Sequence, residues 1–186
     1  MTDTQISPVS AAWPRLERTA PSDQRSFRDA LGRYPTGVVL VSAMTDDGPV
    51  GMAVNSFTSV SLDPPLVSFC PMLTSTTWAK IRPVGGFAIS TLRDCHTDVS
   101  RLFSRRDVDR FGIGEWRLSP AGHPVIADAL GWIDATVEWM TDAGDHELVV
   151  ARATAWSESG DGDPLVFYRG GYHRLAVEGG PDAPLP

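Results

Sequence analysis

Short runs of apolar and β-branched residues recur along this chain, and helices do not alternate with them in a regular way. Residues 37–44 (GVVLVSAM), 66–71 (LVSFCP) and 87–92 (FAISTL) are three such runs. Runs of this length and composition are typical of strands. A doubly wound parallel sheet requires helices between successive strands. The pattern therefore predicts a mainly β domain whose strands close toward a barrel, which limits the exposed sheet edges.

Further strands are expected on both sides of these runs. Residues 37–44 and 50–62 are predicted to form a hairpin joined by the four-residue loop TDDG. Three later segments alternate with a period of two, which brings the expected total to about seven strands. These segments are residues 130–140, 146–157 and 164–175.

Three short helices are also predicted. Ser22 and Asp23 can cap the first, in which Phe27, Ala30, Leu31 and Tyr34 share one apolar face before Pro35. A second helix is expected to begin at Ser75. A third follows residue 96, with Val99, Leu102 and Phe103 on one side.

The domain is expected to span residues 23–178. Residues 1–22 and 179–186 lack a sustained hydrophobic period or are rich in Pro and Gly, so they are predicted to be flexible tails. A length of 186 residues fits a single domain.

Charge and composition exclude several classes of function. The net charge of −7 argues against a nucleic-acid-binding protein, because phosphate affinity requires clustered Lys and Arg. No apolar run approaches the roughly 18 residues of a membrane span, and the first residues are polar where a signal peptide would be apolar. We therefore expect a cytoplasmic protein with two free thiols, Cys70 and Cys95.

The segment GMAVNSFTSVSLDPPLVSFCP, residues 51–71, is unusually rich in small hydroxyl and amide groups. Such a strip of neutral hydrogen-bonding groups suits a planar heteroaromatic ring with amide-like edges. An exposed edge strand whose Ser and Thr side chains face water is the alternative. A second polar group, Thr74 to Thr77, lies where a helix begins, and either caps that helix or binds an anion.

Four motifs in a fixed order resemble the flavin reductase family. They are SFRDALGRYPTGVVLVSA, then GMAVNSFTSVSLDPPLVSFCP followed by TSTTW, then GDHELVVARA, and finally LVFYRGGYHRL. The resemblance covers about residues 23–175. It implies a split β-barrel of Greek-key, FMN-binding type that works as a homodimer, transfers a hydride from NADH, or else NADPH, to FAD or FMN, and supplies reduced flavin to a separate monooxygenase.

The resemblance also implies a set of site residues. Around the flavin ring it places Thr36, Val54, Asn55 and Ser56; along the ribityl chain, Cys70 and Pro71; and at the phosphate, Ser75, Thr76 and Thr77. Arg105 and Arg106 fall where the family contacts the outer part of FAD or the nicotinamide nucleotide. A solvated basic helix end is the alternative for these two arginines.

Two further segments are assigned to the nicotinamide nucleotide. His146, in the motif GDH, is expected beside the reactive face of the flavin, where it positions the nicotinamide. The segment Phe167, Tyr168, Arg169 and Gly170 is expected to bind the rest of that nucleotide, with Arg169 on the pyrophosphate. Alternating inward and outward residues of a last strand would give the same pattern at Phe167 and Tyr168.

The other histidines, His96, His123 and His173, have no partner at metal-ligand spacing and are predicted to be surface or loop residues. No metal is therefore expected. A carrier that binds flavin or haem without turnover, and a reductase that keeps its flavin, remain open alternatives to a reductase that releases it.

Overall fold

The computed structural model describes residues 23–105, 108–158 and 160–175. The two predicted tails, residues 1–22 and 179–186, lie outside these ranges, and so does Arg106. The α-helices are α1 (Gln24–Leu31), α2 (Thr76–Ile81) and α3 (Thr97–Phe103), and short 3-10 turns occur at Arg82–Val84 and Asp94–His96. The strands are β1 (Thr36–Gly37), β2 (Val39–Thr45), β3 (Gly48–Val54), β4 (Thr58–Leu62), β5 (Pro65–Phe69), β6 (Gly86–Thr91), β7 (Trp116–Leu118), β8 (Pro124–Ile126), β9 (Gly131–Ala143), β10 (His146–Glu158), β11 (Val166–Tyr168) and β12 (Gly171–His173).

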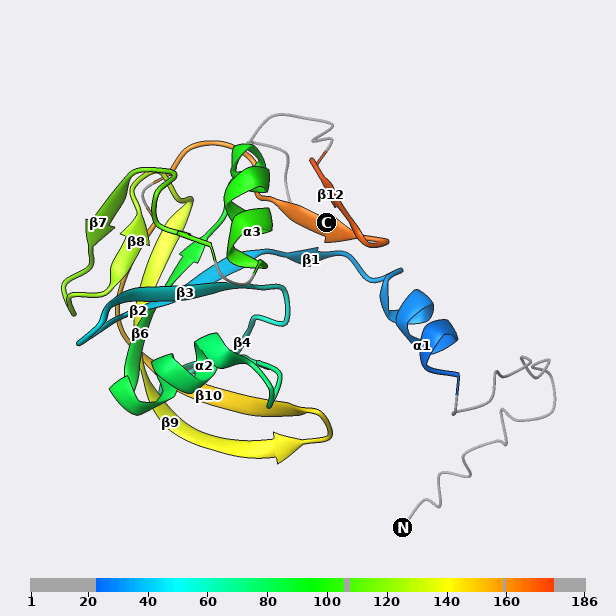
Figure 1. Ribbon diagram of the computed structural model, residues 1–186, viewed down its shortest axis with the longest axis horizontal. Helices are drawn as coiled ribbons and strands as arrows, with labels where there is room; N and C mark the ends of the chain where they lie inside the picture. The colour runs from blue at the N-terminus through cyan, green and yellow to red at the C-terminus, as the bar shows by residue number, and fades with distance from the viewer. Residues whose placement is uncertain (1–22, 106–107, 159, 176–186) are drawn as a thin grey trace, which may run out of the picture.

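Seven strands form the main sheet, in the order β3-β2-β6-β9-β10-β5-β4, and all neighbouring pairs are antiparallel. The long strands β9 and β10 run together as a curved ribbon along one side of the molecule (Figure 1). Two small sheets, β1-β11-β12 and β7-β8, complete the described β structure. The prediction of a mainly β fold with a few short helices is confirmed.

Two predicted boundaries are wrong for local reasons. Thr45 pairs with Gly48, so the first hairpin has a two-residue loop, Asp46 and Asp47, where four residues were expected. Gly48 has a φ of 110°, which glycine adopts readily because it has no Cβ. The strand predicted over residues 50–62 is also interrupted between β3 and β4.

Later in the chain, the predicted last strand is a hairpin. Tyr168 pairs with Gly171, so Arg169 and Gly170 form the turn between β11 and β12. The strand count is therefore higher than the seven expected, because short strands such as β1, β7 and β8 were not anticipated.

The core has two parts, one on each side of β2 and β3. In the first, the rings of Phe69, Trp78 and Phe87 meet edge to face, with centroids 5.3–6.3 Å apart. This cluster holds α2 through Trp78. The second cluster holds α3, whose Phe103 contacts Phe111 at 5.1 Å between centroids. The two helices thus flank β3, as Figure 1 shows.

Helix α1 has no buried residue and projects away from the sheet (Figure 1). The side chain of Asp23 accepts a hydrogen bond from the Ser26 amide at 2.9 Å, which confirms the predicted cap. The predicted apolar face is exposed: Phe27, Leu31 and Tyr34 retain 57–75% of their accessible surface. In the described residues, no helix is both long and apolar enough to cross a membrane.

Candidate functional site

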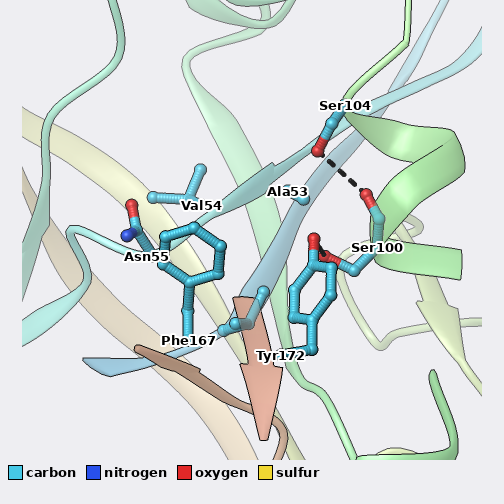
Figure 2. A pocket seen from close by; sticks show the side chains of 8 residues that line it. Ala53, Val54, Asn55, Ser100, Ser104, Phe167 and Tyr172 are labelled. Carbon is cyan, nitrogen blue, oxygen red and sulfur yellow. Dashed lines mark hydrogen bonds between the residues drawn. The ribbon is translucent and has the colours of Figure 1, made fainter. Parts of the chain in front are cut away.

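A pocket of about 140 Å³ lies between the end of β3, helix α3 and the β11-β12 hairpin. Its lining residues are Val38, Ala53, Val54, Asn55, Ser100, Ser104, Phe167 and Tyr172. Figure 2 shows Asn55, Val54 and Phe167 on one side of the pocket and Ser100, Ser104 and Tyr172 on the other. The pocket therefore has an apolar middle with an amide at one end and hydroxyl groups at the opposite end.

Three of the predicted site residues meet at this pocket. Val54 ends β3 and Asn55 follows it, so the strand interruption places the Asn55 amide at the rim. Phe167 comes from β11, more than 110 positions later. Thr36 lies next to this group, because it pairs with Phe167 between β1 and β11.

The hydroxyl oxygen of Thr36 is buried and has no hydrogen-bond partner in the described part of the chain. Buried polar atoms are usually paired. An unpaired hydroxyl beside Phe167 is therefore a group that a bound molecule could satisfy.

Ser56 joins the predicted ring-binding strip to the predicted ribityl segment. Its hydroxyl oxygen accepts from the Cys70 amide at 2.9 Å. The neighbouring Pro71 is buried, and its carbonyl accepts from the Glu147 amide at 2.9 Å. Burial raises the pKa of the Cys70 thiol, which favours the neutral thiol over a reactive thiolate.

Two further hydroxyl groups of the strip match the alternative interpretation. Thr58 and Ser59 belong to β4, an edge strand of the main sheet, and both are exposed. Their side chains therefore face water, and the part of the strip that lines the pocket is limited to Ala53, Val54 and Asn55.

Helix α2 begins as predicted. The Ser75 hydroxyl caps it by accepting from the Trp78 amide at 3.1 Å. Thr76 is exposed and Thr77 is buried. The capping role of Ser75 is thus confirmed, and Thr77 lies against a residue that the sequence did not identify.

That residue is Arg110. Its guanidinium donates to the Thr77 hydroxyl at 2.8 Å and to the Gly51 carbonyl at 2.9 Å. It also donates to the carbonyl of Arg105, whose own side chain is exposed. Arg110 therefore fixes the segment after α3 against α2 and β3. No local sequence pattern identified Arg110 as part of this contact, because its partners Thr77 and Gly51 lie 33 and 59 positions away.

His146 lies apart from the residues that line the pocket. It begins β10 and forms an isolated bridge with Met72, next to Pro71. Its Nδ1 lies 2.7 Å from a carboxylate oxygen of Asp145. The hydrogen bond from His146, together with its positive charge when protonated, lowers the pKa of Asp145. This contact orients the imidazole, whose side chain is 38% exposed.

The segment from Phe167 to Gly170 contains a strained residue. Arg169 has a φ of 49°, which non-glycine residues rarely adopt. Its guanidinium lies 5.2 Å from the centroid of the Tyr168 ring, and its amide donates to the Gly32 carbonyl at 2.9 Å. A positively charged side chain is thus held at the turn of the hairpin that carries Phe167.

Sequence reasoning also missed the hydroxyl end of the pocket. Ser100 lies on α3 and Ser104, four residues later, is its C-cap, so helical spacing could have placed them on one face. The Ser104 hydroxyl donates to the Ser100 carbonyl at 2.9 Å. Tyr172 could not be assigned to the site from local sequence, because it reaches the site only when β12 folds back on β11.

Two histidines are not the surface residues that were predicted. His123 is buried, and burial lowers its pKa, opposed by the charge of Asp134. His96 is also buried, near Cys95 and Asp128, and the potential metal-ligand atoms of these three residues lie within 4.8 Å of one another. His173 is exposed, as expected.

The cluster of Cys95, His96 and Asp128 is poorly suited to a metal. The Nδ1 atom of His96 accepts from the Arg93 amide at 3.1 Å, so the proton of a neutral ring sits on Nε2 and points to Asp128 at 3.0 Å. No ring lone pair is left for a metal, and Arg93 already pairs with Asp128. These contacts fit a structural role.

Comparison with known proteins places this geometry in context. The family described as "Flavin reductase like domain" matches residues 31–176. A protein named flavin reductase, from Pseudomonas putida, is 44% identical over 156 residues, covering 83% of this chain and 92% of its own length. The reductase subunit HsaB of a flavin-dependent monooxygenase from Rhodococcus jostii is 40% identical over 164 residues, with 88% and 82% covered.

Solved structures agree with these relatives. Nitrilotriacetate monooxygenase component B from Mycobacterium thermoresistibile has a TM-score of 0.83 at 39% identity, covering 88% of this chain and 93% of that one. The NADH:FAD oxidoreductase SgcE6 of Streptomyces globisporus, in complex with NAD and FAD fragments, has a TM-score of 0.82 at 30% identity, with 91% and 100% covered.

Proposed function

The chain belongs to the family of flavin reductase-like domains, and from this premise we propose that it transfers a hydride from NADH to FAD or FMN and supplies reduced flavin to a separate monooxygenase. It is an oxidoreductase of the NAD(P)H:flavin class with a mainly β fold of the split-barrel type. The observation that carries the assignment is the pocket, where Val54 and Asn55 of the expected flavin strip meet Phe167 of the expected nucleotide segment.

The residues present fit an uncharged planar ring. The amide of Asn55 offers a directional neutral contact, and Val54 and Phe167 offer apolar surface. Thr36, whose buried hydroxyl is unpaired in the described residues, lies next to Phe167 outside the pocket lining. When bound, the flavin is the group that accepts the hydride. The chain's own residues bind the ring, orient it and exclude water from its face.

We assign the remaining expected residues to the outer parts of the ligands. The Ser56 hydroxyl ties Cys70 to the ring-binding strip, which supports a ribityl chain along Cys70 and Pro71. The helix start at Ser75 supports a phosphate near Ser75, Thr76 and Thr77. Arg105 and Arg106 are assigned to the outer part of FAD or of the nicotinamide nucleotide.

For the nicotinamide nucleotide, we assign the pyrophosphate to Arg169 and Gly170, with Tyr168 as a stacking surface. His146, oriented by Asp145, positions the nicotinamide. His146 does not line the pocket of a single chain.

A homodimer supplies the additional surface in this proposal. The exposed face of Phe27, Leu31 and Tyr34 is apolar and has no cover within the described chain, which supports contact with a second copy. A cytoplasmic location is part of the same proposal, supported by the two free thiols of Cys70 and Cys95.

One assay tests the function. Purified protein is mixed with NADH and either FAD or FMN, and NADH oxidation is followed at steady state. A reductase consumes many equivalents of NADH per chain. A flavin or haem carrier, the competing function, binds flavin and leaves NADH unchanged. The names of the similar proteins favour turnover.

The ring-binding assignment makes a separate prediction. Asn55→Leu and Ser56→Leu should raise the KM for flavin about tenfold, equivalent to about 1.4 kcal/mol, because each removes a neutral polar contact at the ring. Ser59→Leu is the matched control, since Ser59 is exposed on the edge strand β4. An unchanged KM for flavin in the Asn55 and Ser56 variants would contradict the assignment.

A further inference from the structure

The proposed function leaves a pair of hydroxyl groups at the pocket without a role. The Oγ atom of Ser100 and the hydroxyl oxygen of Tyr172 lie 2.8 Å apart, and both residues line the pocket. Each hydroxyl carries one hydrogen, and the bond between them uses one of the two. One hydroxyl hydrogen therefore remains available to another acceptor.

Burial indicates which hydrogen remains. Ser100 has no accessible surface, whereas Tyr172 is partly exposed. A buried hydroxyl hydrogen without an acceptor costs roughly 1–3 kcal/mol, so the favourable arrangement has Ser100 donating to Tyr172. The hydrogen of Tyr172 then faces the pocket, and no described residue accepts it.

The Tyr172 ring is held on two sides. The ring of Phe167 meets it edge on, with centroids 5.6 Å apart, and the guanidinium of Arg101 lies 5.7 Å from its centroid. Since α3 and β12 both contribute to this packing, the hydroxyl group stays at the same end of the pocket. A fixed donor of this kind selects for an acceptor atom in one position.

We propose that Tyr172 is a binding residue that donates its hydroxyl hydrogen to a carbonyl oxygen on the ring held in this pocket. The proposal rests on the proposed function. The pocket, at about 140 Å³, is smaller than the roughly 300–1,000 Å³ of sites that enclose a whole ligand. It therefore takes one ring of a larger molecule. Both the pyrimidine end of a flavin and the carboxamide of nicotinamide present such a carbonyl.

The test compares two variants that break the same hydrogen bond. Tyr172→Phe keeps the ring and its contacts with Phe167 and Arg101 but removes the donor. Ser100→Ala removes the buried partner and leaves the Tyr172 hydroxyl in place. Tyr34→Phe is the matched control, because Tyr34 is an exposed tyrosine that does not line the pocket.

We expect Tyr172→Phe to raise one KM five- to tenfold, with kcat within twofold of the parent. Ser100→Ala should raise the same KM less than Tyr172→Phe does, because the Tyr172 hydroxyl is still present. A rise in the KM for FMN identifies the flavin carbonyl, and a rise in the KM for NADH identifies the carboxamide. Unchanged KM values in Tyr172→Phe would overturn the proposal. So would equal changes in both variants, which indicate a hydrogen bond that only holds α3 to β12.

A direct binding measurement separates this proposal from the function itself. The dissociation constant for FMN, followed by quenching of flavin fluorescence, and that for NADH, followed by its own fluorescence, are measured for the same variants without turnover. If the parent binds FMN but does not oxidise NADH, the reductase assignment fails. The comparison of the dissociation constants then still decides whether Tyr172 donates to a ligand.

Discussion

At the residue scale, Arg169 combines an unfavourable backbone with an exposed turn position. Its φ of 49° costs about 1 kcal/mol relative to glycine, and Gly170, with a φ of 76°, completes the two-residue turn. We predict that Arg169→Gly leaves the free energy of unfolding unchanged or raises it by up to about 1 kcal/mol. The KM for NADH should rise about tenfold, which fits the loss of one charge-assisted hydrogen bond of roughly 1.5–3 kcal/mol.

A truncated hydride donor tests the reason for this rise. Reduced nicotinamide riboside has no pyrophosphate, so its KM should be the same for Arg169→Gly and the parent. Arg174→Ala is the matched control, because this substitution removes the same charge nearby. In the parent, Arg174 pairs with Asp94 at 3.0 Å. An equal rise for both donors would contradict a pyrophosphate contact.

At the element scale, Glu147 attaches α2 to β10. Its buried carboxylate accepts from the Trp78 indole at 2.6 Å and pairs with Arg82 at 3.3 Å. We predict that Glu147→Ala lowers the free energy of unfolding by about 2–3 kcal/mol, because the indole N–H loses its buried acceptor. This loss is smaller than the loss expected for breaking a fully buried ion pair, because the Arg82 side chain is 55% exposed.

Chemical denaturation measures this difference. Glu147→Gln should lose less, because its amide oxygen can still accept from Trp78. Glu138→Ala is the control: Glu138 pairs with Arg152 at 2.7 Å on the surface, where an ion pair is worth about 0–1 kcal/mol. Equal losses for Glu147→Ala and Glu138→Ala would show that Glu147 does not hold α2.

The elements also show what a sequence can and cannot specify. The caps at Asp23 and Ser75 were predictable because each partner lies three residues away. The interruption after Val54 was not, and there Ser56 bonds to Cys70, fourteen positions away, a contact without a local pattern. The hydroxyl pair of Ser100 and Tyr172 has a separation of 72 residues and no local pattern.

The candidate site was therefore predictable in part. Local composition and the family resemblance identified Val54, Asn55 and Phe167, which the pocket brings together. Arg110 and Tyr172 enter through contacts that only the folded chain creates. Burial of His96 could not be read from its neighbours, because its partner Asp128 lies 32 positions later.

At the scale of the whole molecule, the apolar face of α1 is exposed in the described chain. If the proposed homodimer uses this face, Leu31→Glu should weaken self-association at least tenfold, because a charge would replace an apolar contact between copies. Its effect on the free energy of unfolding of one chain should be small, since Leu31 is 57% exposed. Sedimentation velocity over a range of concentrations measures the association.

An exposed leucine elsewhere provides the control. Leu118 is 64% exposed on β7, on the side of the molecule opposite α1 in Figure 1. Leu118→Glu should associate like the parent. A dimer that tolerates Leu31→Glu would place the contact between copies on another surface.

The pocket joins residues from both ends of the described domain, from Val38 to Tyr172. A ribosome makes the chain from its N-terminus, and domains generally fold as units once they have emerged. Val54 and Asn55 are therefore translated long before the aromatic residues that face them. A nascent chain in which β11 and β12 have not yet been translated has no complete cavity. The ability to bind a ring should therefore be acquired late in translation and in a single step.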